Sequence, residues 1–403
     1  MQAPKGTFDV LPEDAEARLQ LLIAARQRLG ASGYGYLETP VFEDTDLFAR
    51  GVGESTDIVQ KEMFTFQDQG GRSLTLRPEG TASVCRAYIE HGMHKRPQPV
   101  RLWYWGPFFR HEAPQAGRFR QFTQMGAEVL GSDDPVIDAE VIALLSDLLE
   151  EAGARELRLR VSSLGTASTR REYTDELKDF LRGRAAELAP EVQARIESNP
   201  LRAFDSSDRG TRAVMKEAPT LLSRLAAEDK EHFDEVCGLL DDAGIAYEVD
   251  PALVRGLVYY TRTVFEFTSD ALGAQSGVGG GGRYDVLVEQ LGGPPTPAIG
   301  WAAGIERIVL AAGGGQAEPP SVDVFVAVPK EARRREAFRL LRSLDSAVMG
   351  EPGRSLKGQM KQADRVGARW TVIVEEEGFE LKDMQSGEQR AVSTPAEVLE
   401  SLR

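Results

Sequence analysis

The chain has 403 residues and carries 63 aspartates and glutamates against 48 lysines and arginines, a net charge of −15. A hydrophobic share of 41% and a charged share of 28% are typical of folded globular proteins and exclude a disordered chain. This length predicts two or three domains. The overall acidity argues against binding nucleic acid over the whole surface, but it leaves room for a local basic site.

The chain shows no sign of a targeting or membrane segment. No apolar run approaches about 18 residues, and the start, MQAPKGTFDVLPED, has neither a signal-peptide core nor a basic presequence. We therefore expect a cytoplasmic protein with no membrane partner. Its two cysteines, Cys85 and Cys237, form no C-x-x-C pair, so buried thiols are expected rather than a disulfide or a zinc site.

In chain order, the first elements are an amphipathic helix over residues 14–30 and a strand-like segment, YGYLETPVFED, that Pro40 interrupts. Residues 101–131 predict a long-looped hairpin, because two apolar and aromatic runs flank a polar loop. A polar, helical stretch without strand runs follows, which predicts an inserted helical subdomain over about 168–232. Residues 253–267 then show a strand pattern, and residues 298–312 predict a small-residue turn that runs into a helix.

The glycine- and proline-rich stretch 311–321 predicts a linker between two domains, 1–320 and 321–403. Residues 321–403 hold 14 basic and 14 acidic side chains, so the net acidity belongs to the first domain. Alternating strands and helices predict a small α/β fold for the second. On one of its helices Lys357, Lys361 and Arg365 form a basic stripe, which is either a solvated face or a contact for an anionic partner.

Three clusters carry possible chemistry. From residue 84 to residue 120 there are seven basic and two acidic side chains, and this excess predicts an anionic ligand near the hairpin. The run GVGGGGRYD contains G-x-G-x-x-G, but no βαβ unit surrounds it. Arg307, one turn into its helix, is either a surface residue or an anion contact. His91 and His94 form an H-x-x-H pair without a supporting metal motif.

Together these motifs resemble a known family. Arg110 followed by His-Glu, the glycine-rich strand and the helix beginning GIER resemble motifs 2 and 3 of class II aminoacyl-tRNA synthetases, with ETPVFED as motif 1. LVRGLVYYTRTVFEF and GGGGRYD resemble the two histidine-specific segments of the histidyl-tRNA synthetase family, and KGTFDVLPED and LRPEGTAS match it too. The resemblance extends from residue 4 to the carboxyl terminus, and the class I signatures HIGH and KMSKS are absent.

The resemblance implies an α+β fold: a class II catalytic domain with a mixed, mostly antiparallel sheet flanked by helices, a helical insertion, and a small C-terminal α/β anticodon-binding domain. It implies ATP-dependent ligation of L-histidine to tRNA(His) through histidyl-adenylate, with release of AMP and pyrophosphate. It also implies Mg²⁺, with unknown ligands, and a homodimer.

The family's roles carry over to particular residues. By the resemblance, catalysis at the α-phosphate belongs to Arg110 and Arg255. ATP is held by Arg110, Glu112, Arg118, Phe122 and Arg307. Histidine is held by Glu79, Thr81, Arg110, Gln124, Glu128, Arg255, Tyr259 and Tyr260. The acceptor end of tRNA contacts Gln115 and Arg120, and the anticodon region contacts Lys357, Lys361 and Arg365.

Two departures from the family pattern stand out: position 258 is Val where the family usually has Asp, and the C-terminal domain looks short. They keep open one alternative, a non-catalytic synthetase-like subunit that regulates histidine biosynthesis. A second alternative, a nucleotide-dependent dehydrogenase built on the glycine run, needs an acidic residue about 20 positions further on a second strand.

Overall fold

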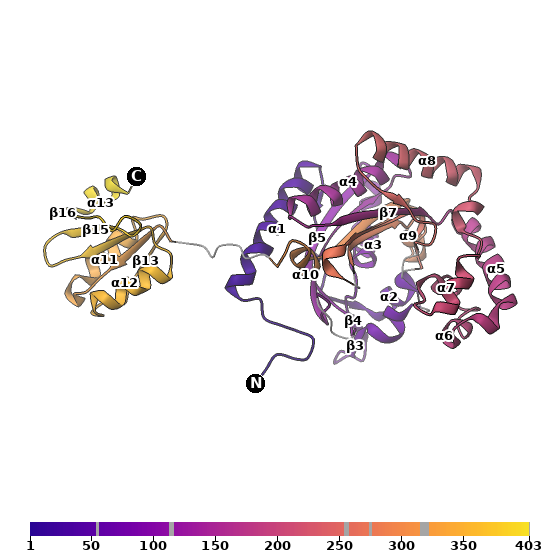
Figure 1. Cartoon of the computed structure of the whole chain (residues 1–403), viewed down its shortest axis with the longest axis horizontal. Helices are drawn as coiled ribbons and strands as arrows, with labels where there is room; N and C mark the ends of the chain where they lie inside the picture. The colour runs from indigo at the N-terminus through magenta and orange to yellow at the C-terminus, as the bar shows by residue number, and fades with distance from the viewer. Residues whose placement is uncertain (54–55, 113–116, 254–257, 274–275, 315–321, 403) are drawn as a thin grey trace. The chain divides into compact units, whose positions relative to one another are not determined.

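The computed structural model describes the chain apart from residues 54–55, 113–116, 254–257, 274–275, 315–321 and 403. The chain divides into two compact units, Met1–Gln316 and Ala317–Arg403 (Figure 1). Within the described residues, no helix is both long and apolar enough to cross a membrane.

An eight-stranded sheet in the order β1-β5-β6-β11-β10-β9-β7-β8 forms the centre of the first unit. Only the edge pairs, β1 with β5 and β7 with β8, are parallel, which confirms the expected mixed, mostly antiparallel sheet. The strands are β1 (Gly35–Tyr36), β5 (Val100–Phe109), β6 (Gln121–Leu130), β7 (Leu157–Ser163), β8 (Glu248–Val249), β9 (Thr261–Ser269), β10 (Gly277–Arg283) and β11 (Ala298–Gly304). Because β10 runs antiparallel to both neighbours, its glycine run is not part of a dinucleotide-binding βαβ unit.

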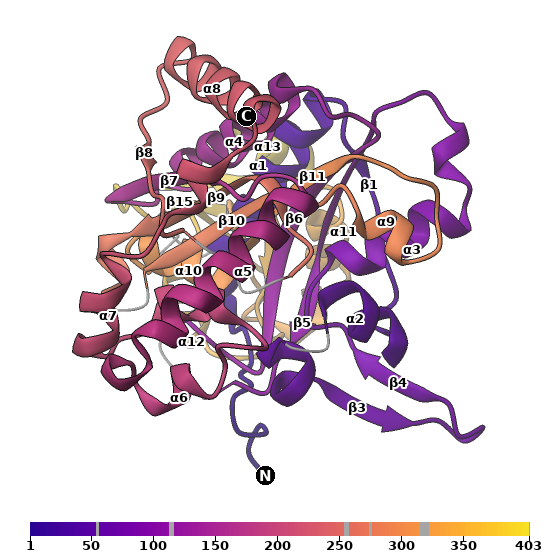
Figure 2. The same ribbon diagram turned by 90° about the vertical axis from the view of Figure 1, so that its right-hand side faces the viewer.

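Helices cover both faces of this sheet (Figure 2). One face packs against α1 (Pro12–Ala31), α4 (Pro135–Glu151), α8 (Ala227–Asp242) and α10 (Ile305–Ala311). The other face packs against α3 (Thr81–Glu90), α9 (Leu287–Gln290) and the inserted helices. Beside the main sheet, α2 (Thr45–Val52) contacts a small sheet of β2 (Phe42–Asp44), β4 (Ser73–Leu76) and β3 (Phe64–Gln67).

The inserted region contains only helices and turns among its described residues. It consists of α5 (Ala167–Gly183), α6 (Pro190–Gln193), α7 (Arg209–Met215) and three short 3₁₀ segments, Ala185–Glu187, Pro200–Asp205 and Leu221–Arg224. Its apolar side chains, such as Tyr173, Leu177 and Leu181, join the same core as the helix-α3 face of the sheet. The insertion is therefore packed onto that face.

Two local predictions were wrong. Residues 298–304 form the central strand β11 instead of a turn, because small side chains suit a strand that lies against close neighbours on both sides. The strand predicted from residue 253 begins only at Thr261: residues 254–257 lie outside the described residues, and the backbone at Val258 and Tyr259 forms a turn instead of pairing in the sheet. Cys85 is buried as expected, whereas Cys237 is only partly buried.

The second unit has a five-stranded sheet in the order β13-β12-β14-β15-β16. Its elements are β12 (Val324–Ala327), α11 (Arg334–Leu341), β13 (Ala347–Met349), α12 (Leu356–Arg365), β14 (Trp370–Val374), β15 (Phe379–Asp383), β16 (Gln389–Val392) and α13 (Pro395–Ser401). Helices α11 and α13 pack on one face and α12 on the other. The expected α/β fold is present, with β16 and α13 as elements that the sequence pattern did not predict.

Candidate active site

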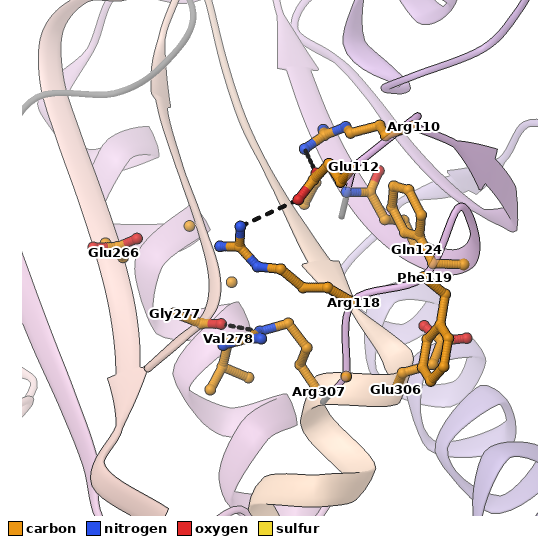
Figure 3. A pocket seen from close by; sticks show the side chains of 16 residues that line it. Arg110, Glu112, Arg118, Phe119, Gln124, Glu266, Gly277, Val278, Glu306 and Arg307 are labelled. Atoms are coloured by element: carbon orange, nitrogen blue, oxygen red, sulfur yellow. Dashed lines mark hydrogen bonds and ion pairs between the residues drawn. The ribbon is translucent and has the colours of Figure 1, made fainter. Parts of the chain in front are cut away.

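An open cavity lies where β6, β10 and β11 meet the first turn of α10 (Figure 3). Its polar wall is formed by three arginines, Arg110, Arg118 and Arg307, and by the carboxylates Glu112 and Glu266. The remaining lining residues are Gly117, Phe119, Phe122, Gln124, Gly277, Val278, Gly279, Gly280, Ala302, Gly304 and Glu306. All five residues expected to hold ATP therefore lie around one cavity.

The hairpin β5–β6 positions the first two arginines. The Nε of Arg110 donates to the carbonyl oxygen of Pro78 at 2.8 Å, and its guanidinium lies 5.5 Å from the ring centroid of Phe122. Glu112 lies between the arginines, 3.2 Å from Arg118 and 3.8 Å from Arg110 (Figure 3). Arg110 is thus fixed beside an aromatic face that can stack on a flat ring.

The third arginine enters from α10. Arg307 donates through Nε to the carbonyl oxygen of Gly277 on the glycine-rich strand. Burial lowers the pKa of Arg307, and the nearby guanidinium of Arg118 lowers it further. Like charges this close favour an anionic ligand between them.

Glu306, the neighbour of Arg307, joins α10 to the sheet by hydrogen bonds. Its carboxylate accepts from the backbone N–H of Thr123 at 3.1 Å and from Arg18 at 3.0 Å. These bonds hold α10 against both β6 and α1, so that Arg307 is set toward the cavity.

A cluster of buried polar side chains continues along the same face of β6. Because side chains alternate along a strand, Phe122, Gln124, Gly126 and Glu128 share one face. Glu128 is fully buried and accepts from the hydroxyls of Thr81 at 2.8 Å and Tyr284 at 2.6 Å. Burial raises the pKa of Glu128 to about 8.

Glu79 is a second buried carboxylate in this cluster. It accepts from the backbone N–H groups of Thr81 and Ala82, each at 2.9 Å, and from the hydroxyl of Tyr259 at 3.4 Å. Burial raises the pKa of Glu79 as well. Two carboxylates joined through Thr81 suit a cationic or proton-donating ligand.

Two buried polar atoms near these carboxylates are available to a ligand. Among the described residues, the hydroxyl of Tyr104 and Oε1 of Gln124 are buried without a hydrogen-bond partner. Leaving such atoms unpaired costs free energy, which a bound ligand recovers. Gly300 faces Glu128 across the sheet, and a Cβ on it would lie 1.6 Å from Oε2. Any residue larger than glycine at position 300 would therefore clash with the carboxylate of Glu128.

Of the other expected residues, Tyr260 is buried with its ring centroid 4.8 Å from that of Tyr259. Arg120 lies at the base of the hairpin loop, where its N–H donates to Gly6 at 2.7 Å, and it does not line the cavity. Arg255 and Gln115 lie outside the described residues.

Three residues of the site were not predicted from the sequence. Tyr284 belongs to the GGGGRYD run, and the alternation along β5 places Tyr104 toward the buried polar cluster, so both had a weak signal. Glu266 lies opposite the arginines, but its apolar strand pattern gave no signal that it belongs to the site.

The family model described as histidyl-tRNA synthetase matches residues 6–308 of this chain. The chain belongs to the histidyl-tRNA synthetase family. A relative in Rubrobacter xylanophilus, named histidine–tRNA ligase, is 50% identical over 97% of this chain and 96% of its own length. A relative of the same name in Desulforamulus reducens is 47% identical over 97% of this chain and 96% of its own length.

A solved structure agrees with this placement. The apo histidyl-tRNA synthetase of S. aureus is 36% identical, with a TM-score of 0.83 and full coverage of both chains. The class II fold expected from the sequence is therefore confirmed.

Proposed function

We propose that this chain ligates L-histidine to tRNA(His) in two steps that consume ATP. In the first step, an oxygen of the histidine carboxylate attacks the α-phosphorus, pyrophosphate leaves, and histidyl-adenylate forms. In the second, a ribose hydroxyl at the end of tRNA takes the histidyl group and AMP leaves. Relatives named histidine–tRNA ligase at 47–50% identity support this activity over the regulatory alternative.

The row of side chains on β6 is the observation that carries the proposal. Phe122 stands at the end with the three arginines and Glu128 at the buried end, with Gln124 between them. ATP would occupy the arginine end, with adenine on Phe122, its α-phosphate at Arg110 and its outer phosphates at Arg118 and Arg307. Aligned cations facing the developing charge are the main source of catalysis in such transfers. By family resemblance, Arg255 would contact the α-phosphate and the histidine carboxylate.

The buried end suits histidine. The unpaired Oε1 of Gln124, with Glu79 and Thr81, would accept from the α-ammonium group, and Glu128 with Tyr259 and Tyr260 would surround the imidazole. The imidazole offers an N–H that a carboxylate can accept. A site with such buried polar groups rejects amino acids that would leave them unpaired.

Magnesium fits the cavity through Glu112 and Glu266. The described residues hold no group of three metal-ligating side chains, but Mg²⁺ commonly uses one or two carboxylates together with substrate phosphates. Both carboxylates line the cavity, although Glu266 also pairs with Arg160 at 2.6 Å. Bound there, Mg²⁺ would neutralise charge on the outer phosphates.

Contacts with tRNA are proposed at two places. Gln115 and Arg120 in the hairpin loop would meet the acceptor end. In the second unit, Lys357, Lys361 and Arg365 on α12 would meet the anticodon region.

Exposed apolar side chains in the amino-terminal elements, among them Leu19, Ile23 and Tyr36, support a homodimer, which analytical ultracentrifugation would test.

Amino-acid-dependent ATP–pyrophosphate exchange tests the activity. Each of the twenty amino acids is supplied in turn, and only histidine is expected to stimulate exchange. No stimulation by histidine would rule out adenylate formation. Exchange without subsequent charging of tRNA(His) would contradict the second step alone.

A further inference from the structure

Tyr259 and Tyr260 lie in a segment that, among the described residues, is not paired in the sheet, since β9 begins only at Thr261. A side chain from the insertion holds its backbone instead. Arg170, in the first turn of α5, donates through Nη1 to the carbonyl oxygen of Val258 at 2.7 Å and to that of Tyr260 at 2.9 Å. One cationic group therefore fixes the peptide that precedes Tyr259 and the peptide that follows Tyr260.

A second connection lies just beyond this segment, at Arg262. Its backbone has a φ of 42°, in the left-handed region that residues other than glycine rarely adopt. Its N–H donates to Gly165, and its carbonyl oxygen accepts from Leu164, both at 2.7 Å. The turn that leads from β7 into the insertion thus holds Arg262 in an unfavourable conformation, a sign of structural constraint.

Both ends of the insertion meet at Asp229, a buried residue at the start of α8. Its carboxylate accepts from Nε of Arg262 at 3.0 Å, from the N–H of Thr166 at 2.8 Å and from the hydroxyl of Thr169 at 3.2 Å. Thr166 and Thr169 stand where the insertion begins, and Asp229 stands where it ends. The insertion is therefore closed onto residues 258–262 by charged hydrogen bonds.

We infer that Arg170 is a positioning residue through which the insertion orients Tyr259 and Tyr260 for histidine. The inference rests on the proposed function of those two tyrosines. Arg170 does not line the cavity assigned to ATP. Loss of the Arg170 side chain should therefore weaken the binding of histidine and leave the binding of ATP unchanged.

The contacts of Arg170 suggest a large effect. Burial lowers the pKa of Arg170, although the side chain also lines an open cleft, and its acceptors among the described residues are two backbone carbonyls. The side chain of Val258 lies against Gly53, which leaves its carbonyl turned to Arg170. Removing a charged donor from two carbonyls should raise the KM for histidine about 10- to 100-fold.

The test compares Arg170→Met, which keeps most of the packing but no donor, with Arg170→Lys, which keeps a charge and donors. ATP–pyrophosphate exchange on the full chain gives the KM for each substrate, and calorimetry gives the affinity for histidine directly. We expect Arg170→Met to raise the KM for histidine, with the KM for ATP unchanged within about twofold, and Arg170→Lys to recover part of the loss. Arg171→Met is the matched control, because Arg171 is its exposed neighbour in the same cleft.

Thermal unfolding separates positioning from simple stabilisation. A lower unfolding midpoint with unchanged affinity for histidine would overturn the inference, and so would equal rises in both KM values. If Arg170→Met does not fold, Arg170→Gln carries the test: it removes the charge and shortens the side chain, so affinity for histidine equal to that of the parent chain would also overturn the inference. Absence of histidine-dependent exchange in the parent chain would instead refute the proposed function.

Discussion

The buried carboxylate of Glu128 should make the free protein less stable as the pH rises. In the unfolded chain a glutamate has a pKa near 4.5, whereas burial raises that of Glu128 to about 8 in the folded chain. The folded state therefore binds the proton more tightly. Replacing Glu128 by Gln keeps a neutral side chain of the same shape and removes this titration.

The sign and size follow from linkage. The stabilisation from the raised pKa is fully present below pH 4.5 and is lost progressively as the pH rises to about 8. At about 1.4 kcal/mol per pH unit, this interval corresponds to about 5 kcal/mol. Glu128→Gln should lack this part of the slope, so its advantage over the parent chain should grow between pH 5 and pH 8.

Urea unfolding of the free protein at several pH values measures this difference. Glu289→Gln is the control, since Glu289 is exposed and its replacement should leave the pH slope unchanged. The variant should also bind histidine more weakly, because an amide would replace the carboxylate that Glu128 can offer to the imidazole in the proposed function. Parallel stability curves for the parent and Glu128→Gln between pH 5 and pH 8 would refute the reasoning.

Three further predictions concern the rest of the machinery. Arg110→Ala should lower histidine-dependent exchange about 10²- to 10³-fold, because it removes a cation at the α-phosphate, and exchange close to that of the parent would contradict this role. Gly300→Ala should destabilise the fold by about 3 kcal/mol or more in urea unfolding, since its Cβ would meet Glu128, whereas Gly30→Ala, with open space around it, should stabilise α1 by up to about 1 kcal/mol. Deleting residues 321–403 should spare exchange but severely impair charging of tRNA; charging at the parental rate would remove the anticodon role from the second unit.

The hairpin and its arginines could be predicted from the sequence because their signals are local. Residues 100–109 and 121–130 are long aromatic and apolar runs, and the polar loop between them contrasts sharply with both. Arg110 and Arg118 flank that loop, so the hairpin fold alone brings them to one end of the sheet. Arg307 follows from a helix start that the sequence also marks.

The buried polar cluster around Glu128 could not be predicted in the same way, because it depends on pairing between distant strands. Gly300 makes room for Glu128 only because β11 lies beside β6 in this register. The run of residues 298–304 is short and rich in alanine and glycine, so it does not predict a strand. The contact between Gly300 and Glu128 therefore has no local signal in the sequence. The hydrogen bonds of Arg170 and Asp229 likewise join residues that are 33 to 90 positions apart in the sequence.

Negative and positive side chains lie at opposite ends of the row along β6, and in the proposed function this separation would orient the substrates. Glu79 and Glu128 stand at the buried end, and Arg110, Arg118 and Arg307 stand at the open end. Phe122 and Glu128 are six residues apart on one strand, which is about 20 Å at about 3.4 Å per residue. In the proposed function, a histidine with its ammonium and imidazole toward the carboxylates would direct its own carboxylate at Arg110. The reverse orientation would place like charges together in a buried site, where repulsion is least screened. The separation of charge proposed to select histidine would therefore also point the attacking oxygen at the α-phosphate.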